Sequence, residues 1–148
     1  MLAAMPNADH YRRLERMFAS APVSQWQGAS AEVSERRAVV TIAVKQEFFH
    51  AAQAVHGSLY FRALDDAAFF AVNSVVDDVF VLTVSFTIYF TRPITGGVLR
   101  AEGRLIHSSS RLYIAESTLV NDEGKLLGRG SGTFMKSTIP LQDALGYA

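Results

Sequence analysis

The stretch that decides the fold is GSLYFRALDDAAFFAVNSV, residues 57–75. If successive residues turn by about 100°, its apolar side chains leave almost no polar face, which is typical of a buried helix. Its few polar side chains nevertheless fall in one sector: Ser58, Arg62, Asp65, Asp66 and Asn73. We therefore expect a central helix, and something polar must meet that one sector.

Alternating sequence follows this helix. Between residues 79 and 90 every second side chain is apolar, and Thr83 falls on the opposite, more polar face. Gly128, Gly130 and Gly132 share one face of a later segment, which predicts either the close approach of another surface or a strong bend. We expect four long antiparallel strands joined by hairpin turns, the other three at residues 98–107, 112–120 and 126–135.

The sequence before the central helix predicts a shorter helix and a hairpin. Asp9 is placed to cap a helix that runs to about Ser20, and Pro22 follows its end. A short hairpin comes next: residues 29–33 and 39–44, with a polar turn at 34–37. This order predicts a single α+β domain over residues 1–148 with one curved sheet. Because one sheet cannot wrap an apolar helix completely, we expect a second copy of the chain to cover the rest.

The amino-acid composition excludes several classes of binding partner and of catalytic chemistry. Fourteen Lys and Arg residues balance 14 Asp and Glu residues, so no net field attracts nucleic acid or an anionic membrane. The absence of cysteine excludes disulfides, thiolate catalysis and cysteine-ligated metal sites. Residues 1–9 lack the pattern of an export signal, and no apolar run reaches the roughly 18 residues that span a bilayer. We therefore expect a cytoplasmic protein that binds neither nucleic acid nor membranes.

The start of the central helix carries the candidate chemistry. Unpaired amides and the positive end of the helix dipole suit a polarised carbonyl or an anion, and Gly57 lets a substrate approach that backbone. Gly57 and Ser58 are also consistent with an ordinary loop-to-helix junction. Asp65 lies two turns further on and projects within about 20° of Ser58. Arg62 is spaced to pair with Asp66 at i,i+4 or with Asp65 at i,i+3, and spacing alone does not decide which aspartate is functional.

Other polar residues give weaker signals. His50 and His56 have no third histidine or cysteine at ligand spacing, so a hydrogen-bonding role is favoured over a metal site. Thr83 is also consistent with an ordinary strand residue. No G-x-S-x-G elbow, Walker loop or dinucleotide fingerprint is present, which leaves the serine-hydrolase, nucleotide and nicotinamide classes unsupported.

The run HGSLYFRALDDA, residues 56–67, resembles the H-G-G-x(6)-D-x-A signature of hotdog-fold acyl-CoA thioesterases of the phenylacetate-degradation (PaaI-like) type. Residues 83–93 resemble the strand of that family that ends in F-x-R-P, and residues 130–134 resemble its last strand. The likeness extends over residues 30–137 and leaves the N-terminal helix, residues 9–20, as an addition.

This resemblance implies a curved antiparallel sheet wrapped around one long helix, with two protomers building two active sites across their interface. By position, the Gly57 amide would polarise the thioester carbonyl and Asp65 would act as general base or nucleophile. Asp66 then has a structural role. His50 stands where the family often has an amide side chain, and Thr83 where some members have a hydroxyl that positions water.

The resemblance also bears on binding. His56 and Ser58 are expected to contact the substrate, and Ser58 replaces the second glycine of the signature. A homodimer or a dimer of dimers is implied, with no metal or redox cofactor. We expect the CoA phosphates near basic residues at strand ends and turns: Arg92, Arg100, Arg104, Arg111, Lys125 and Arg129.

Three functions fit these residues. The first is acyl-CoA thioester hydrolysis through Gly57 and Asp65. The second is a non-catalytic module that binds acyl-CoA or an aromatic ligand, for which a buried Asp65 carboxylate has little use. The third is an enoyl-CoA hydratase-like enzyme, which needs a catalytic histidine, and only His50 or His56 is available. The aromatic side chains suit aryl and medium aliphatic acyl groups alike.

Overall fold

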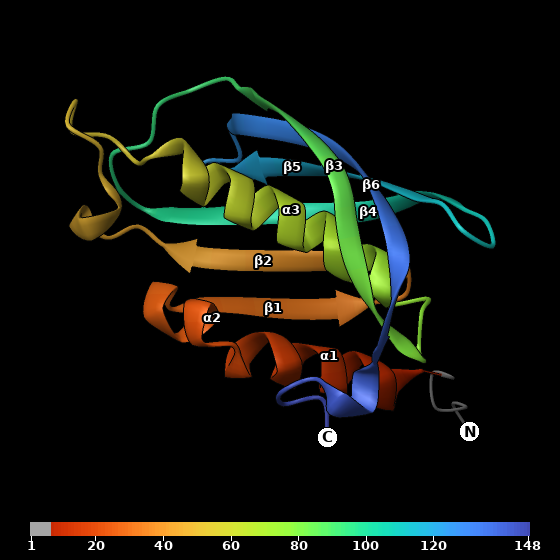
Figure 1. Cartoon of the computed structure of the whole chain (residues 1–148). Helices are drawn as coiled ribbons and strands as arrows, with labels where there is room; N and C mark the ends of the chain where they lie inside the picture. The colour runs from red at the N-terminus through yellow and green to blue at the C-terminus, as the bar shows by residue number, and fades with distance from the viewer. Residues whose placement is uncertain (1–6) are drawn as a thin grey trace, which may run out of the picture.

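The computed structural model describes residues 7–148, so residues 1–6 of the stretch inspected for an export signal lie outside the described residues. Short 3-10 turns precede α3 and follow β6, at Gln46–Phe48 and Leu141–Asp143. The helices and strands, labelled in Figure 1, have these bounds: α1 (Ala8–Ser20), α2 (Pro22–Gln27), β1 (Ala29–Ser34), β2 (Arg37–Ala43), α3 (Gly57–Asn73), β3 (Val79–Phe90), β4 (Val98–Ser108), β5 (Tyr113–Val120) and β6 (Leu126–Pro140).

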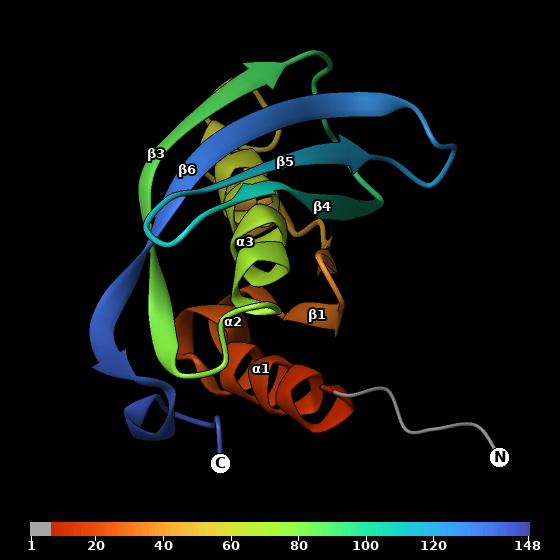
Figure 2. The ribbon, with the colours of Figure 1, turned by 90° about the vertical axis from the view of Figure 1, so that its right-hand side faces the viewer.

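The six strands form one antiparallel sheet in the order β1-β2-β4-β5-β6-β3. The sheet curves around α3, and α1 with α2 lies beyond β1 on the same side (Figures 1 and 2). The Phe18 ring of α1 meets the Phe70 ring of α3 edge-on at 5.4 Å, which joins this extra layer to the central helix. The predicted α+β arrangement and the extra N-terminal helix are therefore confirmed.

The neighbours of β3 differ from the prediction. Its bounds are those expected, but it pairs with β6 and not with β4, so residues 91–97 form a crossing connection and not a hairpin turn. The reason is that alternation identifies a strand and its two faces but says nothing about which strand lies beside it. β3 is consequently an edge strand, as is β1 at the other end of the sheet.

The two faces of β3 also differ from the prediction. Its pairing with β6 shifts register between Val79 and Val81 and again between Thr83 and Ser85. At the second shift two steps of β3 oppose one step of β6, so this bulge adds one residue to β3 and places the residues before it and after it on opposite faces. Leu82 and Val84, predicted on one apolar face with the other even-numbered residues, are therefore 48% and 59% exposed. Thr83, predicted on the polar face, points towards α3.

The glycines of β6 accommodate a neighbouring side chain. A Cβ atom at Gly130 or at Gly132 would lie 2.4 Å from the ring of Phe86, which extends over them from β3. Phe86 belongs to the neighbouring strand of the same sheet, and β6 also bends strongly along its length (Figures 1 and 2), so both features that the sequence allowed are present. Gly103 of β4 plays a similar part, because a Cβ there would lie 2.0 Å from the Ala67 carbonyl oxygen of α3.

Both ends of the chain correct the prediction. Asn7, not Asp9, precedes the first helical residue, and Asp9 instead pairs with Arg13 at 2.8 Å. Pro22 begins α2, a helix that the sequence pattern missed because it is only six residues long. The C-terminal segment, residues 141–148, was also missed, and it packs against α1.

Most of α3 is buried within one chain. Its side chains meet the concave sheet face on one side and α1 with α2 on the other, so the chain covers more of the helix than expected. Asn73, predicted in the polar sector, is 0% exposed and donates to the Val76 carbonyl oxygen. The residues of α3 that are not fully buried form one stripe along the helix, hereafter the open stripe: Gly57, Ser58, Phe61, Arg62, Asp65 and Asp66.

Candidate active site

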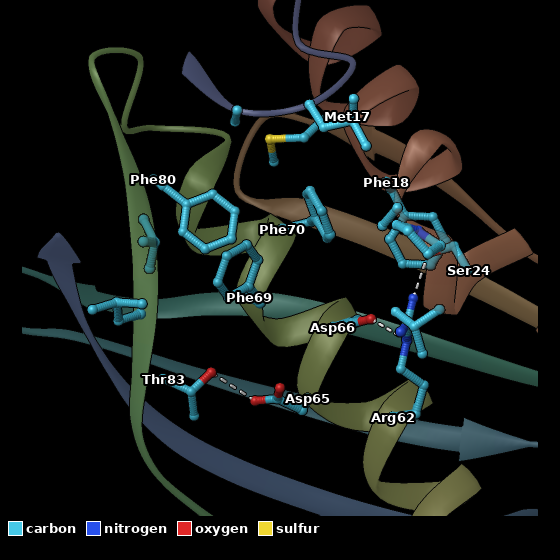
Figure 3. Close-up of a pocket in the computed structure, with 17 residues that line it drawn as sticks. Met17, Phe18, Ser24, Arg62, Asp65, Asp66, Phe69, Phe70, Phe80 and Thr83 are labelled. Carbon is cyan, nitrogen blue, oxygen red and sulfur yellow. Dashed lines mark hydrogen bonds and ion pairs between the residues drawn. The ribbon is translucent and has the colours of Figure 1, made fainter. Parts of the chain in front are cut away.

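Two adjacent aspartates of α3 have different partners. The Thr83 hydroxyl of β3 donates to Asp65 Oδ1 at 2.9 Å. Arg62 Nε lies 2.5 Å from Asp66 Oδ2, and its Nη2 donates to the Ser24 hydroxyl of α2 at 2.6 Å (Figure 3). The expected ion pair between Arg62 and Asp66 is confirmed, and Asp65 is left facing β3.

Burial sets the electrostatics of this pair. Desolvation raises the pKa of Asp65, while the Thr83 hydrogen bond and the Arg62 charge lower it by less. Desolvation, reinforced by the adjacent Asp65, raises the pKa of Asp66 to about 7 in spite of the Arg62 guanidinium. A carboxylate whose pKa is raised is a stronger base, so Asp65 is suited to accept a proton.

A cavity of about 450 Å³ opens beside Asp65 and Thr83. Most of its wall is aromatic or aliphatic, and its polar part consists of the two aspartates with Arg62, Thr83 and Ser24. Figure 3 shows Asp65 and Thr83 at one end, phenylalanines in the middle and Met17 at the opposite end. This volume and this mixture of surfaces are typical of a site for a small ligand with one reactive polar group.

The start of α3 forms a second cluster. His56 is the N-cap, and its Nδ1 accepts the Ser58 N–H at 3.1 Å, while its carbonyl oxygen accepts the Leu59 N–H at 3.0 Å. Among residues 7–148, no recorded hydrogen bond uses the Gly57 N–H. The outermost amide of the helix is thus available to an oxygen of a ligand. His56 and Ser58, predicted to contact substrate, bond to one another in this chain.

His50 lines a second cavity, of about 300 Å³, together with Gly57 and Arg92. The Tyr60 hydroxyl donates to the Arg92 carbonyl oxygen at 2.6 Å and so holds the end of β3 over the helix start. His50 itself accepts the Ala52 N–H at 3.1 Å. His50 and Gly57, which the sequence analysis placed in one candidate site, therefore line the same cavity. The contact of Tyr60 with Arg92 was not predicted, because the sequence carries no signal for it.

The two clusters do not meet within one chain. Gly57 and Asp65 are separated by eight residues of a helix, and at a rise of ~1.5 Å per residue this is about 12 Å along its axis. An oxyanion donor and a catalytic carboxylate must each lie within about 3 Å of atoms of the same carbonyl group. Each chain therefore carries two separate clusters, hereafter called half-sites: one holds Gly57 and His50, the other Asp65 and Thr83.

The predicted CoA-binding residues are dispersed. Of the six, Arg92 alone lines the cavity at Gly57. Arg104 lies 2.5 Å from Glu102 and Arg129 lies 3.6 Å from Glu116, so both have carboxylate partners on the sheet. Lys125 pairs with Glu123 at 3.4 Å.

Neither a metal centre nor a membrane span is found within residues 7–148. No three His, Asp or Glu side chains there lie close enough together to hold a metal ion. No helix in the same range is long and apolar enough to cross a bilayer.

Comparison with known proteins gives the family. The family model described as the thioesterase superfamily matches residues 52–127, which include Gly57, Asp65 and Thr83. The chain belongs to the thioesterase superfamily. Its curved sheet around one helix is the hotdog fold of that superfamily, and the resemblance to PaaI-like proteins is confirmed.

Individual members of the thioesterase superfamily extend this comparison. A candidate esterase of Saccharolobus solfataricus is 29% identical over 98 residues, which cover 66% of this chain and 70% of that protein. The E. coli PaaI protein from the phenylacetic acid degradation operon superposes with a TM-score of 0.83 at 22% identity, over 92% of this chain and 99% of that one. A phenylacetic acid degradation-related protein of Ralstonia eutropha gives 0.75 at 23% identity, over 85% and 98%. The two solved structures show a shared fold.

Proposed function

We propose that the protein hydrolyses acyl-CoA thioesters at a site made of Asp65 from one protomer and Gly57 of the partner subunit. The observation that carries the proposal is the partly buried Asp65 carboxylate, which Thr83 holds at the edge of an apolar cavity. Burying a carboxylate is costly, and a site that only binds an acyl group gains nothing from it. Membership of the thioesterase superfamily supports hydrolysis as the reaction.

In the proposed reaction, Gly57 and Asp65 act on opposite sides of the carbonyl. The Gly57 N–H, at the positive end of α3, donates to the carbonyl oxygen and stabilises the negative charge that develops there. Asp65 either removes a proton from the attacking water or adds to the carbonyl carbon itself, which gives an anhydride that water then cleaves. In both routes the carbon–sulfur bond breaks, CoA leaves as thiolate and takes up a proton, and the free acid results.

Three features favour assembly from two chains. The separation of about 12 Å along α3 keeps Gly57 and Asp65 of one chain apart. β3 is an edge strand of 12 residues without proline or lysine, which is open to pairing with a second copy. The open stripe, with Phe61 43% exposed, faces the same region because Phe61 contacts Phe86 of β3. A dimer along β3 would cover both.

The hydratase alternative has less support. It needs a histidine at the catalytic carboxylate, and neither histidine of the same chain lines the cavity of Asp65. His50 lies with Gly57 and would reach Asp65 only as part of the shared site. His56 is also occupied as the N-cap of α3.

A substrate screen tests the proposal. Acyl-CoA thioesters with short, medium, long and aryl acyl groups are incubated with the protein, and released CoA is followed with a thiol-detecting reagent. We expect rapid release for at least one class and none from the matched S-alkyl-CoA thioethers, which have no carbonyl. Tight binding of these compounds without CoA release from any thioester would favour the non-catalytic binding module.

A further inference from the structure

The C-terminal segment, residues 141–148, lines one end of the Asp65 cavity. Ala144 and Leu145 of this segment line the cavity together with Met17 of α1. We call residues 141–148 the strap, because they leave β6 and run across α1 (Figure 1). The sequence signature of the central helix, residues 56–67, does not include this segment.

The strap is anchored at both of its ends. Leu141 is 1% exposed, and its N–H donates to the Asp78 carbonyl oxygen at 3.1 Å. Near the other end, the Tyr147 hydroxyl lies 2.7 Å from His10 Nδ1. His10 Nε2 lies 2.8 Å from the Asn73 carbonyl oxygen, which can only accept. Nε2 therefore donates, and Nδ1 of a neutral His10 accepts the proton of Tyr147.

Between its anchors the strap fits closely against α1. Gly146 has φ +84, a conformation that favours glycine, and a Cβ there would lie 2.3 Å from the Ser20 hydroxyl oxygen. The position of Ala144 and Leu145 is consequently fixed by contacts on both sides of them. The strap is therefore a fixed part of the cavity wall.

The cavity leads from the catalytic half-site to this wall. Asp65 and Thr83 lie at one end. Phe69, one turn further along α3, and Phe80 of β3 come next, and Met17 lies at the far end, where the strap crosses (Figure 3). The rings of Phe69 and Phe80 are 5.2 Å apart and form part of the apolar middle. A carbonyl held at Asp65 would thus direct its acyl group along the phenylalanines towards the strap.

From this arrangement we infer that the strap, through Ala144 and Leu145, sets the maximum length of the acyl group. The inference rests on the proposed function, because it takes the acyl group of an acyl-CoA as the occupant. Each methylene buried in an apolar cavity tightens binding by about fourfold. That gain must stop at the length at which the acyl chain meets the strap.

Binding of S-alkyl-CoA thioethers of increasing chain length tests the wall without requiring turnover. The variants are Leu145→Ala, which shortens the wall, and Ala144→Phe, which fills the end of the cavity. Leu112→Ala is the matched control, since Leu112 is also an exposed leucine but lies outside the cavity lining. Dissociation constants and, for the matching thioesters, kcat/KM are measured for every length.

We expect affinity to rise with chain length and then reach a plateau. Leu145→Ala should move the plateau to longer chains and Ala144→Phe to shorter ones, while Leu112→Ala leaves it in place. The same plateau in all four proteins would overturn the inference, and hydrolysis of the thioesters would still support the proposed function. A shifted plateau without hydrolysis of any thioester would support the wall and contradict the proposed function.

Discussion

Asp65 and Asp66 are adjacent in sequence, yet their side chains have different partners: Thr83 for Asp65 and Arg62 for Asp66. One residue of helix turns the second carboxylate by about 100°, towards Arg62 and α2 and away from β3. Asp65→Asn should lower thioester turnover by about two to four powers of ten, because its side chain can no longer take a proton or attack. Asp66→Asn should lower it far less. The check is kcat/KM for both variants, with circular dichroism to show that both are folded.

The opposite result would be informative. If Asp66→Asn is inactive and Asp65→Asn is active, the assignment of roles within the doublet is reversed. If both variants are as active as the wild type, the catalytic account of α3 fails.

Thr83 contacts the proposed base, Asp65. Its hydroxyl donates to the Asp65 carboxylate and lowers the pKa of that group, so Thr83→Val, which removes the hydroxyl but keeps the shape, should raise it. Because the base works when ionised, the acid limb of the pH–rate profile should move to higher pH. Thr83→Ser, which keeps a hydroxyl, should restore the wild-type profile. An unchanged acid limb in Thr83→Val would contradict this role.

Asp66 makes stability depend on pH. Its pKa rises from 3.8 to about 7 on folding, mainly through desolvation, so between these values the folded state holds a proton that the unfolded chain has lost. Its stabilising contribution is complete below the lower value and is lost as the pH rises through the higher one. The wild type should therefore lose Tm between pH 5 and pH 8 relative to Asp66→Asn. Parallel Tm curves for the two proteins would contradict the raised pKa.

Several contacts at the residue scale follow from spacing and others do not. The pair of Arg62 and Asp66 is four residues apart on one helix, so the sequence alone predicts it. The bond between Thr83 and Asp65 joins two elements, and the bulge in β3 moves Thr83 to the face opposite to the one that alternation predicts. Residues that meet through irregular backbone leave no periodic signal in the sequence.

At the scale of the element, the N-terminus of α3 supplies the proposed oxyanion donor. Gly57→Pro removes the N–H, and proline is well tolerated at the first position of a helix. His56 before it has φ -64 and ψ 142, which is the conformation that a following proline favours. Loss of one such donor should lower kcat by about 10²–10³-fold.

Gly57→Ala is the matched control for this change. Like proline, alanine adds a Cβ atom, which would lie 3.1 Å from the Phe90 ring, but alanine keeps the N–H. The prediction is near-normal activity for alanine and a large loss for proline. Equal losses in both variants would show that crowding at Phe90, and not the missing donor, is responsible.

The elements themselves show how far sequence reasoning reaches. The bounds of β3 and the first residue of α3 were predicted, because alternation and apolar periodicity end sharply there. The place of β3 beside β6 was not, since pairing partners are chosen by the packing of the whole sheet. The strap was missed because its anchors, Leu141 and Tyr147, lie in a segment with no periodicity.

At the scale of the whole molecule, the proposed shared site requires a second copy of the chain. β3 is exposed at the edge of the sheet, the open stripe lies next to it, and neither half-site contains all the groups of the reaction. Self-association along β3 would pair the exposed edge strand and cover the open stripe. It would also create two equivalent sites related by a two-fold axis. Light scattering that shows a monomer at micromolar concentration would contradict this arrangement.

The most direct test combines the two inactive variants in one dimer. Gly57→Pro and Asp65→Asn chains with different tags are co-expressed, and the mixed dimer is isolated by two successive affinity steps. If each site takes Gly57 from one chain and Asp65 from the other, the mixed dimer contains one intact site of two and should regain about half of the wild-type turnover. If both groups act within one chain, the mixed dimer has no intact site. Turnover as low as that of either parent would then contradict the shared site.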